Sequence, residues 1–357
     1  MVRLLWQNKI KSGLFTGLCF LLTNAVSEAS VIGGASGAYL RAPAGAAALA
    51  QGGANTAYPD YMTPWWNPAI MAMSKTKKAS VGIGLRSFGR TEAFASYEFH
   101  VPPRVGAGIS FLYRGDPFLN DLYDSNEEPI DNASYTTLTT KIGFSYYINR
   151  KFSAGINVGI FYQRLPTASD ENGNVTYSST KGGIGSFDFA LAYKHSDKLN
   201  LALVIRDVGA YMDWEIRTNN DYLSSVVEDR PLPSITLGSR YKGTLLDKPL
   251  IWNIDLRGYF FDGKWNRLYR PEANLGAGWE WQYWDKFYIR AGIGDFLING
   301  NLISKSEKYL SVFPFRITSG FSFDLSRSRQ DLKLNYGIAT DKAWAGIDQQ
   351  IDLSISF

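Results

Sequence analysis

The stretch AFASYEFHVPPRVGAGISFLY, residues 93–113, decides the fold of this chain. Apolar side chains take every second position from 93 to 101 and again from 105 to 113, and Pro102-Pro103 separates the two runs. Successive side chains of a β-strand point to opposite faces, so each run predicts a strand with one continuous apolar face. The short turn between the runs makes the pair an antiparallel hairpin.

The same alternation continues over residues 79–357 and predicts about 14 strands of roughly 8 to 14 residues, long enough to cross a bilayer when tilted. No stretch of 18 apolar residues follows residue 30, so such a chain can span a membrane only as a closed barrel. The second face of the strands carries glycine and charge, with charged residues at Arg86, Glu98, Arg104, Lys141, Asp188, Lys194, Arg206, Arg240, Asp255, Arg257, Glu272, Glu280, Arg290, Arg316, Asp324, Lys333 and Asp352.

A soluble β-sandwich also alternates apolar and polar residues, and the connections distinguish the two folds. Short turns follow even-numbered strands, as at 102–103 and 149–151, whereas long loops follow odd-numbered strands, as at 115–133, 166–183 and 208–232. Outer-membrane barrels sort their connections in this way, with short turns in the periplasm and long loops outside. We therefore predict an all-β fold, a transmembrane antiparallel barrel of about 14 strands with both termini in the periplasm.

Aromatic residues fall where a barrel in a lipid bilayer needs them. Trp252, Trp281, Tyr283 and Phe287 would lie near the periplasmic rim, where a ring can sit among acyl chains while its polar edge meets water. The chain ends within an alternating run at Phe357. A last strand with a terminal aromatic residue resembles the signal that the bacterial barrel-assembly machinery recognises.

The composition agrees with strands that face lipid on one side and a polar interior on the other. The chain is 45% apolar and 15% aromatic, yet its mean hydropathy is −0.16. One cysteine and two histidines, His100 and His195, leave no disulfide framework, no histidine-rich metal site and no catalytic triad, so we expect neither a cofactor nor enzymatic activity. The small formal net charge of +4 gives no argument for nucleic acid.

Two segments precede the predicted barrel. Residues 1–29 read as a secretory signal peptide, with a basic start, an apolar core too short to span a membrane, and cleavage after Ser27 or Ala29. Residues 30–78 do not alternate; Pro43–Gly52 predicts a short alanine-rich helix. Because a linker would lack so much Trp, Tyr and Met, we expect residues 30–78 to fold into the lumen as a plug, with the lumen-facing glycines leaving room for its backbone.

The plug sequence resembles a known family. AGAAALAQGGANTAYPD, residues 44–60, followed by WWNPA, residues 65–69, is similar to the N-terminal signature of the PorV/PorQ family, which belongs to the FadL-like barrels. The resemblance implies 14 strands around an N-terminal hatch, with Asn67, Pro68 and Ala69 on the hatch motif. It also implies an outer-membrane component of type IX secretion that receives secreted cargo through the cargo's sorting domain. The same superfamily implies an alternative, the uptake of hydrophobic small molecules such as fatty acids.

Different residues would serve these functions, and an open general porin is disfavoured by the plug. Uptake needs an apolar lining, and the apolar exceptions on the lumen faces would either supply one or pack against the plug: Phe94, Leu112, Phe161 and Val204. Cargo handling needs apolar tips on the outer loops, because exposed apolar patches usually contact partners. The candidates for such contacts are Phe118, Leu119, Tyr123, Tyr211 and Trp214.

Overall fold

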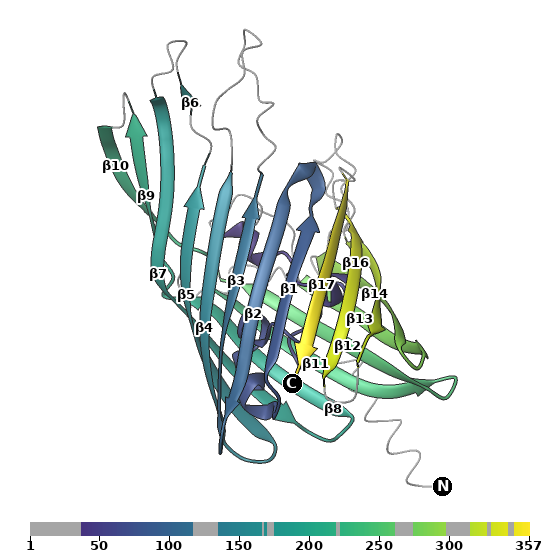
Figure 1. Cartoon of the computed structure of the whole chain (residues 1–357). Helices are drawn as coiled ribbons and strands as arrows, with labels where there is room; N and C mark the ends of the chain where they lie inside the picture. The colour runs from purple at the N-terminus through teal and green to yellow at the C-terminus, as the bar shows by residue number, and fades with distance from the viewer. Residues whose placement is uncertain are drawn as a thin grey trace.

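The computed structural model describes residues 37–116, 135–165, 168–169, 175–218, 222–260, 274–297, 315–326, 330–341 and 346–357. They form a closed antiparallel barrel of 14 strands, which confirms the predicted fold class (Figure 1). The strands of the wall are β1 (Lys78–Leu85), β2 (Thr91–Val101), β3 (Val105–Gly115), β4 (Thr136–Tyr147), β5 (Phe152–Arg164), β7 (Val175–Lys194), β8 (Leu199–Val208), β11 (Ser234–Leu245), β12 (Lys248–Tyr259), β13 (Asn274–Trp284), β14 (Phe287–Leu297), β15 (Arg316–Asp324), β16 (Asp331–Thr340) and β17 (Ile347–Ser356).

The first and last strands of the barrel close it. β1 pairs with β2 on one side and with β17 on the other, where Ala79 lies opposite Ile355. Beyond the last strand, Phe357 exchanges two backbone hydrogen bonds with Lys77, at 3.0 and 3.1 Å. The terminal residue is thereby part of the seam, and its side chain is half exposed on the outer surface.

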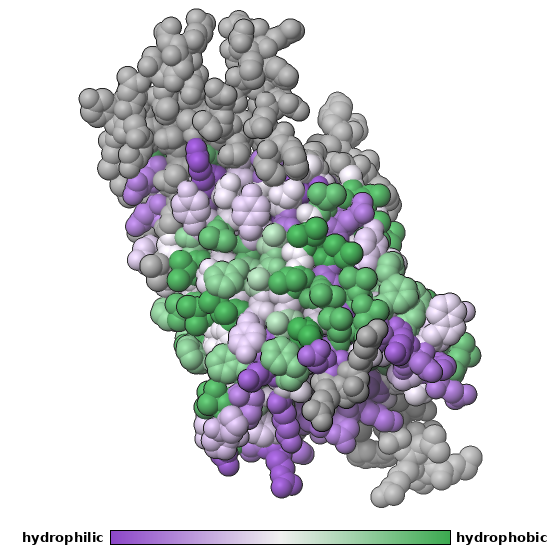
Figure 2. Space-filling model, viewed as in Figure 1, coloured by the Kyte–Doolittle hydropathy of each residue, from purple (hydrophilic) through white to green (hydrophobic). Residues whose placement is uncertain are grey.

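The two faces of each strand lie in different surroundings. On β1, Val81, Ile83 and Leu85 are 56%, 64% and 58% exposed, whereas Phe94 and Glu98 of the neighbouring β2 are buried inside. Figure 2 shows the outer apolar side chains as a belt around the middle of the barrel, with polar residues toward both ends. The alternation in the sequence thus separates a lipid-facing surface from a packed interior. No helix among the described residues is long and apolar enough to cross a membrane.

Two predicted loops contain strands. β7 is 20 residues long and begins at Val175, so much of the expected loop 166–183 belongs to it. The expected loop 208–232 contains β9 (Met212–Thr218) and β10 (Tyr222–Asp229), which form a hairpin paired to the upper part of β7, above the wall with the short β6 (Ala168–Ser169) (Figure 1). These strands project beyond the apolar belt, where a strand needs no lipid-facing apolar side, so apolar alternation could not reveal them.

Residues 37–77 fill the barrel interior, and we call them the plug. They contain η2 (Ala38–Arg41), α2 (Ala46–Ala50), α3 (Thr63–Trp66) and η3 (Pro68–Met73), which Figure 1 shows in purple inside the strands. The helix expected over Pro43–Gly52 is shorter than predicted, because Gly45, with a φ of 94°, precedes it and Gly52, with a φ of 68°, follows it. Outside the plug, η4 (Ser87–Gly89) lies in the connection between β1 and β2.

Candidate functional site

The Asn-Pro-Ala motif holds the lower part of the plug together. Asn67 is fully buried, and its Oδ1 accepts a hydrogen bond from the backbone N–H of Ala69 at 3.0 Å, which caps the start of η3. Its Nδ2 donates to the carbonyl of Thr56 at 2.9 Å. Pro68 occupies the first helical position, where its missing N–H leaves no bond unmade. One side chain thus joins two segments of the plug.

The plug lies directly against the wall where the wall has no side chain. A Cβ at Gly155 of β5 would overlap the backbone N of Ala69, and Ser153 beside it donates to the carbonyl of Ala69 at 2.6 Å. At the other side of the lumen a Cβ at Gly337 of β16 would overlap the carbonyl of Ala46. Glycine at these positions permits the close approach of two backbones, as expected from the lumen-facing glycines.

Charged side chains of the wall bind the backbone of the plug. Arginines donate to plug carbonyls, as Arg206 does to Trp66 and Arg240 to Tyr58. Carboxylates accept plug N–H groups, as Glu98 does from Thr63 at 3.0 Å. These contacts satisfy polar backbone groups that the short plug helices leave unbonded.

A buried ionic cluster lies at the end of the lumen away from Phe357. Glu92 accepts from Arg86 at 2.7 Å and from Arg114 at 2.5 Å, and Asp348 pairs with Arg86 at 3.1 Å and with Arg316. Arg86 and Arg316 are among the lumen charges predicted from the sequence, whereas Glu92, Arg114 and Asp348 were not predicted. Strand parity could have found them, because Glu92 shares the lumen face of β2 with Phe94.

The four apolar residues of the lumen faces are buried against the plug. Phe94 and Leu112 pack in one cluster with Trp65, Trp66, Tyr61 and nearby alanines of the plug. Val204 packs with Ala69 and Ile70. Phe161 lies with Ala210 and Met212, beside the partly buried Tyr39 and Leu40 of the plug.

The outer-loop candidates fall into two groups. Phe118, Leu119 and Tyr123 lie outside the described residues. Tyr211, just before β9, is 44% exposed, and Trp214 within β9 is partly buried. Tyr211 is therefore the one candidate in the described part whose ring is open to a partner.

Two small polar cavities lie between the plug and the wall, each of about 20 Å³. They adjoin one another, because Arg41 and Arg257 line both. A cavity of this size holds roughly one water molecule. Each cavity is far smaller than the sites that hold drug-sized ligands, so the passage of such a solute would require the plug to move.

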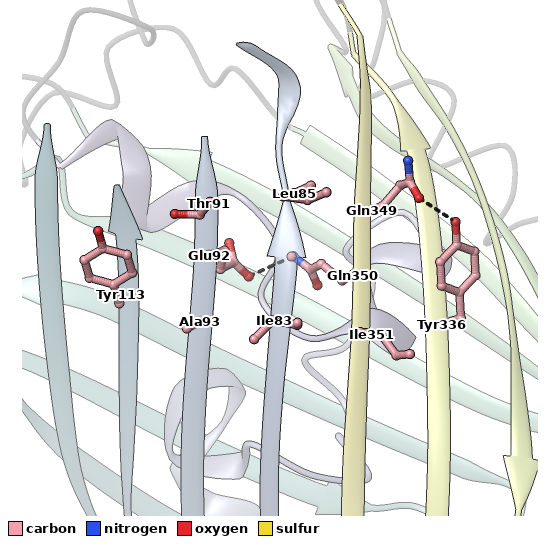
Figure 3. A pocket seen from close by; sticks show the side chains of 11 residues that line it. Ile83, Leu85, Thr91, Glu92, Ala93, Tyr113, Tyr336, Gln349, Gln350 and Ile351 are labelled. Carbon is pink, nitrogen blue, oxygen red and sulfur yellow. Dashed lines mark hydrogen bonds between the residues drawn. The ribbon is translucent and has the colours of Figure 1, made fainter. Parts of the chain in front are cut away.

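A much larger groove lies on the lipid-facing side of the wall. It has a volume of about 450 Å³ and crosses β17, β1 and β2, with Tyr113 of β3 and Tyr336 of β16 at its two sides (Figure 3). Its apolar lining includes Ile83, Leu85 and Ile351. The small side chain of Ala93 leaves the space between these larger ones.

The floor of the groove includes Gly84 of β1. Gly84 has no side chain, and Gln350 and Glu92, both lumen-facing, meet directly behind it through a 2.8 Å hydrogen bond (Figure 3). At the edge of the groove, Tyr336 donates to Gln349 at 3.0 Å. This groove was not predicted from the sequence, because it combines residues 83–113 with residues 336–351.

No cluster of three potential metal-binding side chains occurs among the residues that the structure describes. The arrangement of the described residues provides an apolar surface groove, a packed plug and buried ion pairs.

Solved structures with a similar fold include the toluene transporter TbuX of Ralstonia pickettii, which is 14% identical with a TM-score of 0.56 over 88% of this chain and 97% of that one. The toluene transporter TodX of Pseudomonas putida is 14% identical, with a TM-score of 0.52 over 88% of this chain and 97% of that one. A FadL homologue of Pseudomonas aeruginosa is 11% identical, with a TM-score of 0.53 over 87% of this chain and 97% of that one. No family model and no curated protein matches the chain. The feature that this chain shares with these proteins is the fold.

Proposed function

We propose that this chain is an outer-membrane channel for hydrophobic small molecules, which pass from the lumen sideways into the lipid. The observation that carries the proposal is the 450 Å³ apolar groove at the β17–β1–β2 seam. Its volume lies within the range of about 300 to 1,000 Å³ that is usual for small-molecule sites. The similar barrels TbuX and TodX, both described as toluene transporters, support this reading over other roles.

A sideways exit suits an apolar solute. Moving apolar surface from water into hydrocarbon gains about 25 cal/mol per Å², so a molecule with roughly 150 Å² of apolar surface gains about 4 kcal/mol. Release into the periplasm would forfeit this gain. The groove already lies in the lipid-facing belt, beside Ile83 and Ile351, which are 64% and 43% exposed.

Transport requires the plug to move, because the described part of the lumen is packed. The contacts that would have to rearrange are behind Gly84, where Gln350 binds both Glu92 and the carbonyl of Pro43 in the plug. The bond from Gln350 to the carbonyl of Pro43 joins the groove floor to the outer end of the plug. We place the N- and C-terminal ends of the barrel in the periplasm, with β6, β9 and β10 outside.

Filling the groove tests the proposal. Ala93→Trp should slow the uptake of a hydrophobic fluorescent probe such as N-phenyl-1-naphthylamine by at least fivefold in intact Gram-negative cells that express the chain. Ala291→Trp is the matched control, since Ala291 lies on the lipid face of β14 away from the groove. Equal surface levels of the proteins are verified first. Uptake that stays equal in both variants and the unmodified chain would contradict the proposed exit.

Cargo handling in type IX secretion is the second candidate. The packing of the plug favours it, because a barrel that carries protein cargo at its outer loops needs no path through the lumen. The N-terminal motif of this chain, whose Asn67 is buried in the plug, is the feature that resembles the PorV/PorQ family. A Tyr211→Ser variant that loses binding to cargo sorting domains, with probe uptake absent from the unmodified chain, would establish this role instead.

A further inference from the structure

β8 leaves regular pairing at its outer end and turns two consecutive side chains inward. Its register against β7 shifts between Phe187 and Phe189, and Asp207 has a φ of 59°. Arg206 and Asp207 are consequently both buried, although neighbours in a regular strand point to opposite faces. Bulges that re-aim a side chain in this way are common beside functional sites.

Arg206 is buried without a carboxylate partner. It donates to the carbonyl of Trp66 and its guanidinium lies 5.7 Å from the centre of the Trp66 ring. Among the described residues its Nε has no hydrogen-bond partner, and no ion pair within 4.0 Å involves its side chain. Other lumen arginines differ, since Arg240 pairs with Asp60 and Arg290 with Glu280.

Arg257 of β12, which is partly buried, is a second lumen cation without a described carboxylate partner. Its Nε donates to Thr236 at 3.3 Å and its Nη1 to the carbonyl of Arg41 at 3.4 Å. In the part of the chain that the structure describes, no carboxylate comes within 4.0 Å of it. A guanidinium removed from water without a counter-ion is strongly unfavourable.

Arg206 and Arg257 line the same cavity of about 20 Å³, next to Arg41 of the plug. Asp207 also lines this cavity, but neither it nor any other described carboxylate lies within 4.0 Å of the two guanidiniums. Asp207 accepts from Ser186 at 3.0 Å, and in the adjoining cavity Asp255 accepts the N–H groups of Asn55 and Thr56 at 3.0 Å. Asp295, which lines that adjoining cavity, lies 3.9 Å from Arg316.

We propose that this cavity binds one small monovalent anion, chloride or a carboxylate of acetate size, between the guanidiniums of Arg206 and Arg257. The anion would pair directly with two guanidiniums that no described carboxylate approaches within 4.0 Å, and charge-assisted bonds from arginine suit it. It would also fix the outer end of the plug, because Arg257 binds the carbonyl of Arg41 at the end of η2. The site is independent of the transport proposed above.

The test uses the full-length protein in detergent, at constant ionic strength, with sodium chloride or acetate replacing a bulky sulfonate buffer salt. We expect either anion to raise the melting temperature saturably by about 3 °C. Crystals soaked in bromide should show one anomalous peak between the two guanidiniums. If neither anion changes the melting temperature and no bromide peak appears, the proposal is overturned.

Variants separate the site from general effects of charge. Arg257→Gln should abolish the anion-dependent shift and the bromide peak. Arg240→Gln, which removes a paired lumen arginine, should lower the melting temperature yet keep the shift. If Arg257→Gln does not fold, the titration and bromide peak of the unmodified protein still decide. Stabilisation by decanoate but by neither chloride nor acetate also overturns the proposal, because the site would then hold the head group of an amphiphile.

Discussion

Gln350 of β17 and Glu92 of β2 join across the strand that separates them, with Nε2 of Gln350 donating to Oε1 of Glu92 at 2.8 Å. They can meet because Gly84 of β1, which lies between the two strands, has no side chain. A Cβ at Gly84 would lie 2.8 Å from Cγ of Gln350 and 2.9 Å from the carbonyl of Gln349. The absence of a side chain at Gly84 therefore allows this contact across the barrel seam, at the groove floor and next to the plug.

Gly84→Ala should separate Gln350 from Glu92 and lower stability. We expect a loss of about 1–3 kcal/mol, as is typical for a group forced into a packed space, because one neighbour is backbone and cannot rotate away. Thermal unfolding in detergent measures the loss. Gly258→Ala is the control, since the nearest atom to its Cβ would be Cγ2 of Ile235 at an ordinary 3.8 Å. Equal melting temperatures for the two variants would contradict the argument.

Glu92→Gln should loosen the outer end of the plug. Glu92 is 2% exposed and accepts from both Arg86 and Arg114. Removing one partner of a buried ion pair costs about 3–5 kcal/mol, because the remaining charge stays buried. Hydrogen exchange of residues 39–43 should accelerate, since Arg86 and Arg114 bind carbonyls in that stretch.

Asp197→Asn provides the control for the Glu92 variant. Asp197 pairs with Lys194 at 2.7 Å in an exposed turn, where water screens the charges. We expect no measurable change in stability or in exchange at residues 39–43. Similar effects from both variants would mean that exchange in the plug reports net charge and not the buried cluster.

The alternation of side chains was enough to predict which residues face lipid and which face the plug. It placed Phe94 and Glu98 inside and Ile83 outside. Side chains alternate along a strand, so one face of a membrane-crossing strand meets lipid and the other meets the barrel interior. It also predicted the packing of plug backbone on lumen glycines such as Gly155. These features depend on local pattern alone.

The groove and the pair of cations Arg206 and Arg257 depend on features that the alternation does not describe. The groove joins Ile83 and Ala93 to Ile351, more than 250 residues away along the chain and adjacent only through the register that closes the barrel. The inward turn of both Arg206 and Asp207 depends on a bulge, which breaks the very alternation used for prediction. Features that depend on the pairing of distant strands, or on a local bulge, therefore could not be predicted from the alternation of side chains.

Asn67→Ala should destabilise the plug without altering the wall. The substitution removes the cap on Ala69 and the bond to Thr56, and buried hydrogen bonds of this kind contribute about 1–3 kcal/mol when a partner is left unsatisfied. Limited proteolysis within the plug, with the barrel still resistant to heat in detergent, is the expected result. Asn149→Ala, which removes a comparable cap in an exposed turn, should leave proteolysis unchanged.

Asp60→Asn should remove an acid-sensitive contact between the plug and β11. Burial raises the pKa of the Asp60 carboxyl, but Arg240, 3.1 Å away, acts together with Lys333, Arg290 and Lys78 to hold the pKa below its ordinary value. A carboxyl with a lowered pKa stabilises the fold fully above its unfolded pKa of about 4 and loses that effect as the pH falls toward the folded value.

The melting temperature of the unmodified chain should therefore fall between pH 5 and pH 3 by more than that of Asp60→Asn, while the two curves run parallel above pH 5. The difference should be small, because the Asp60 side chain is 37% exposed and solvent screens the pair. Arg240→Gln supplies the complementary test. Arg240 is the strongest of the charges that lower the pKa of Asp60, so without it the acid-dependent difference should shrink. Curves that diverge above pH 5 instead would assign the acid response to another group, because Asp60 is ionised throughout that range.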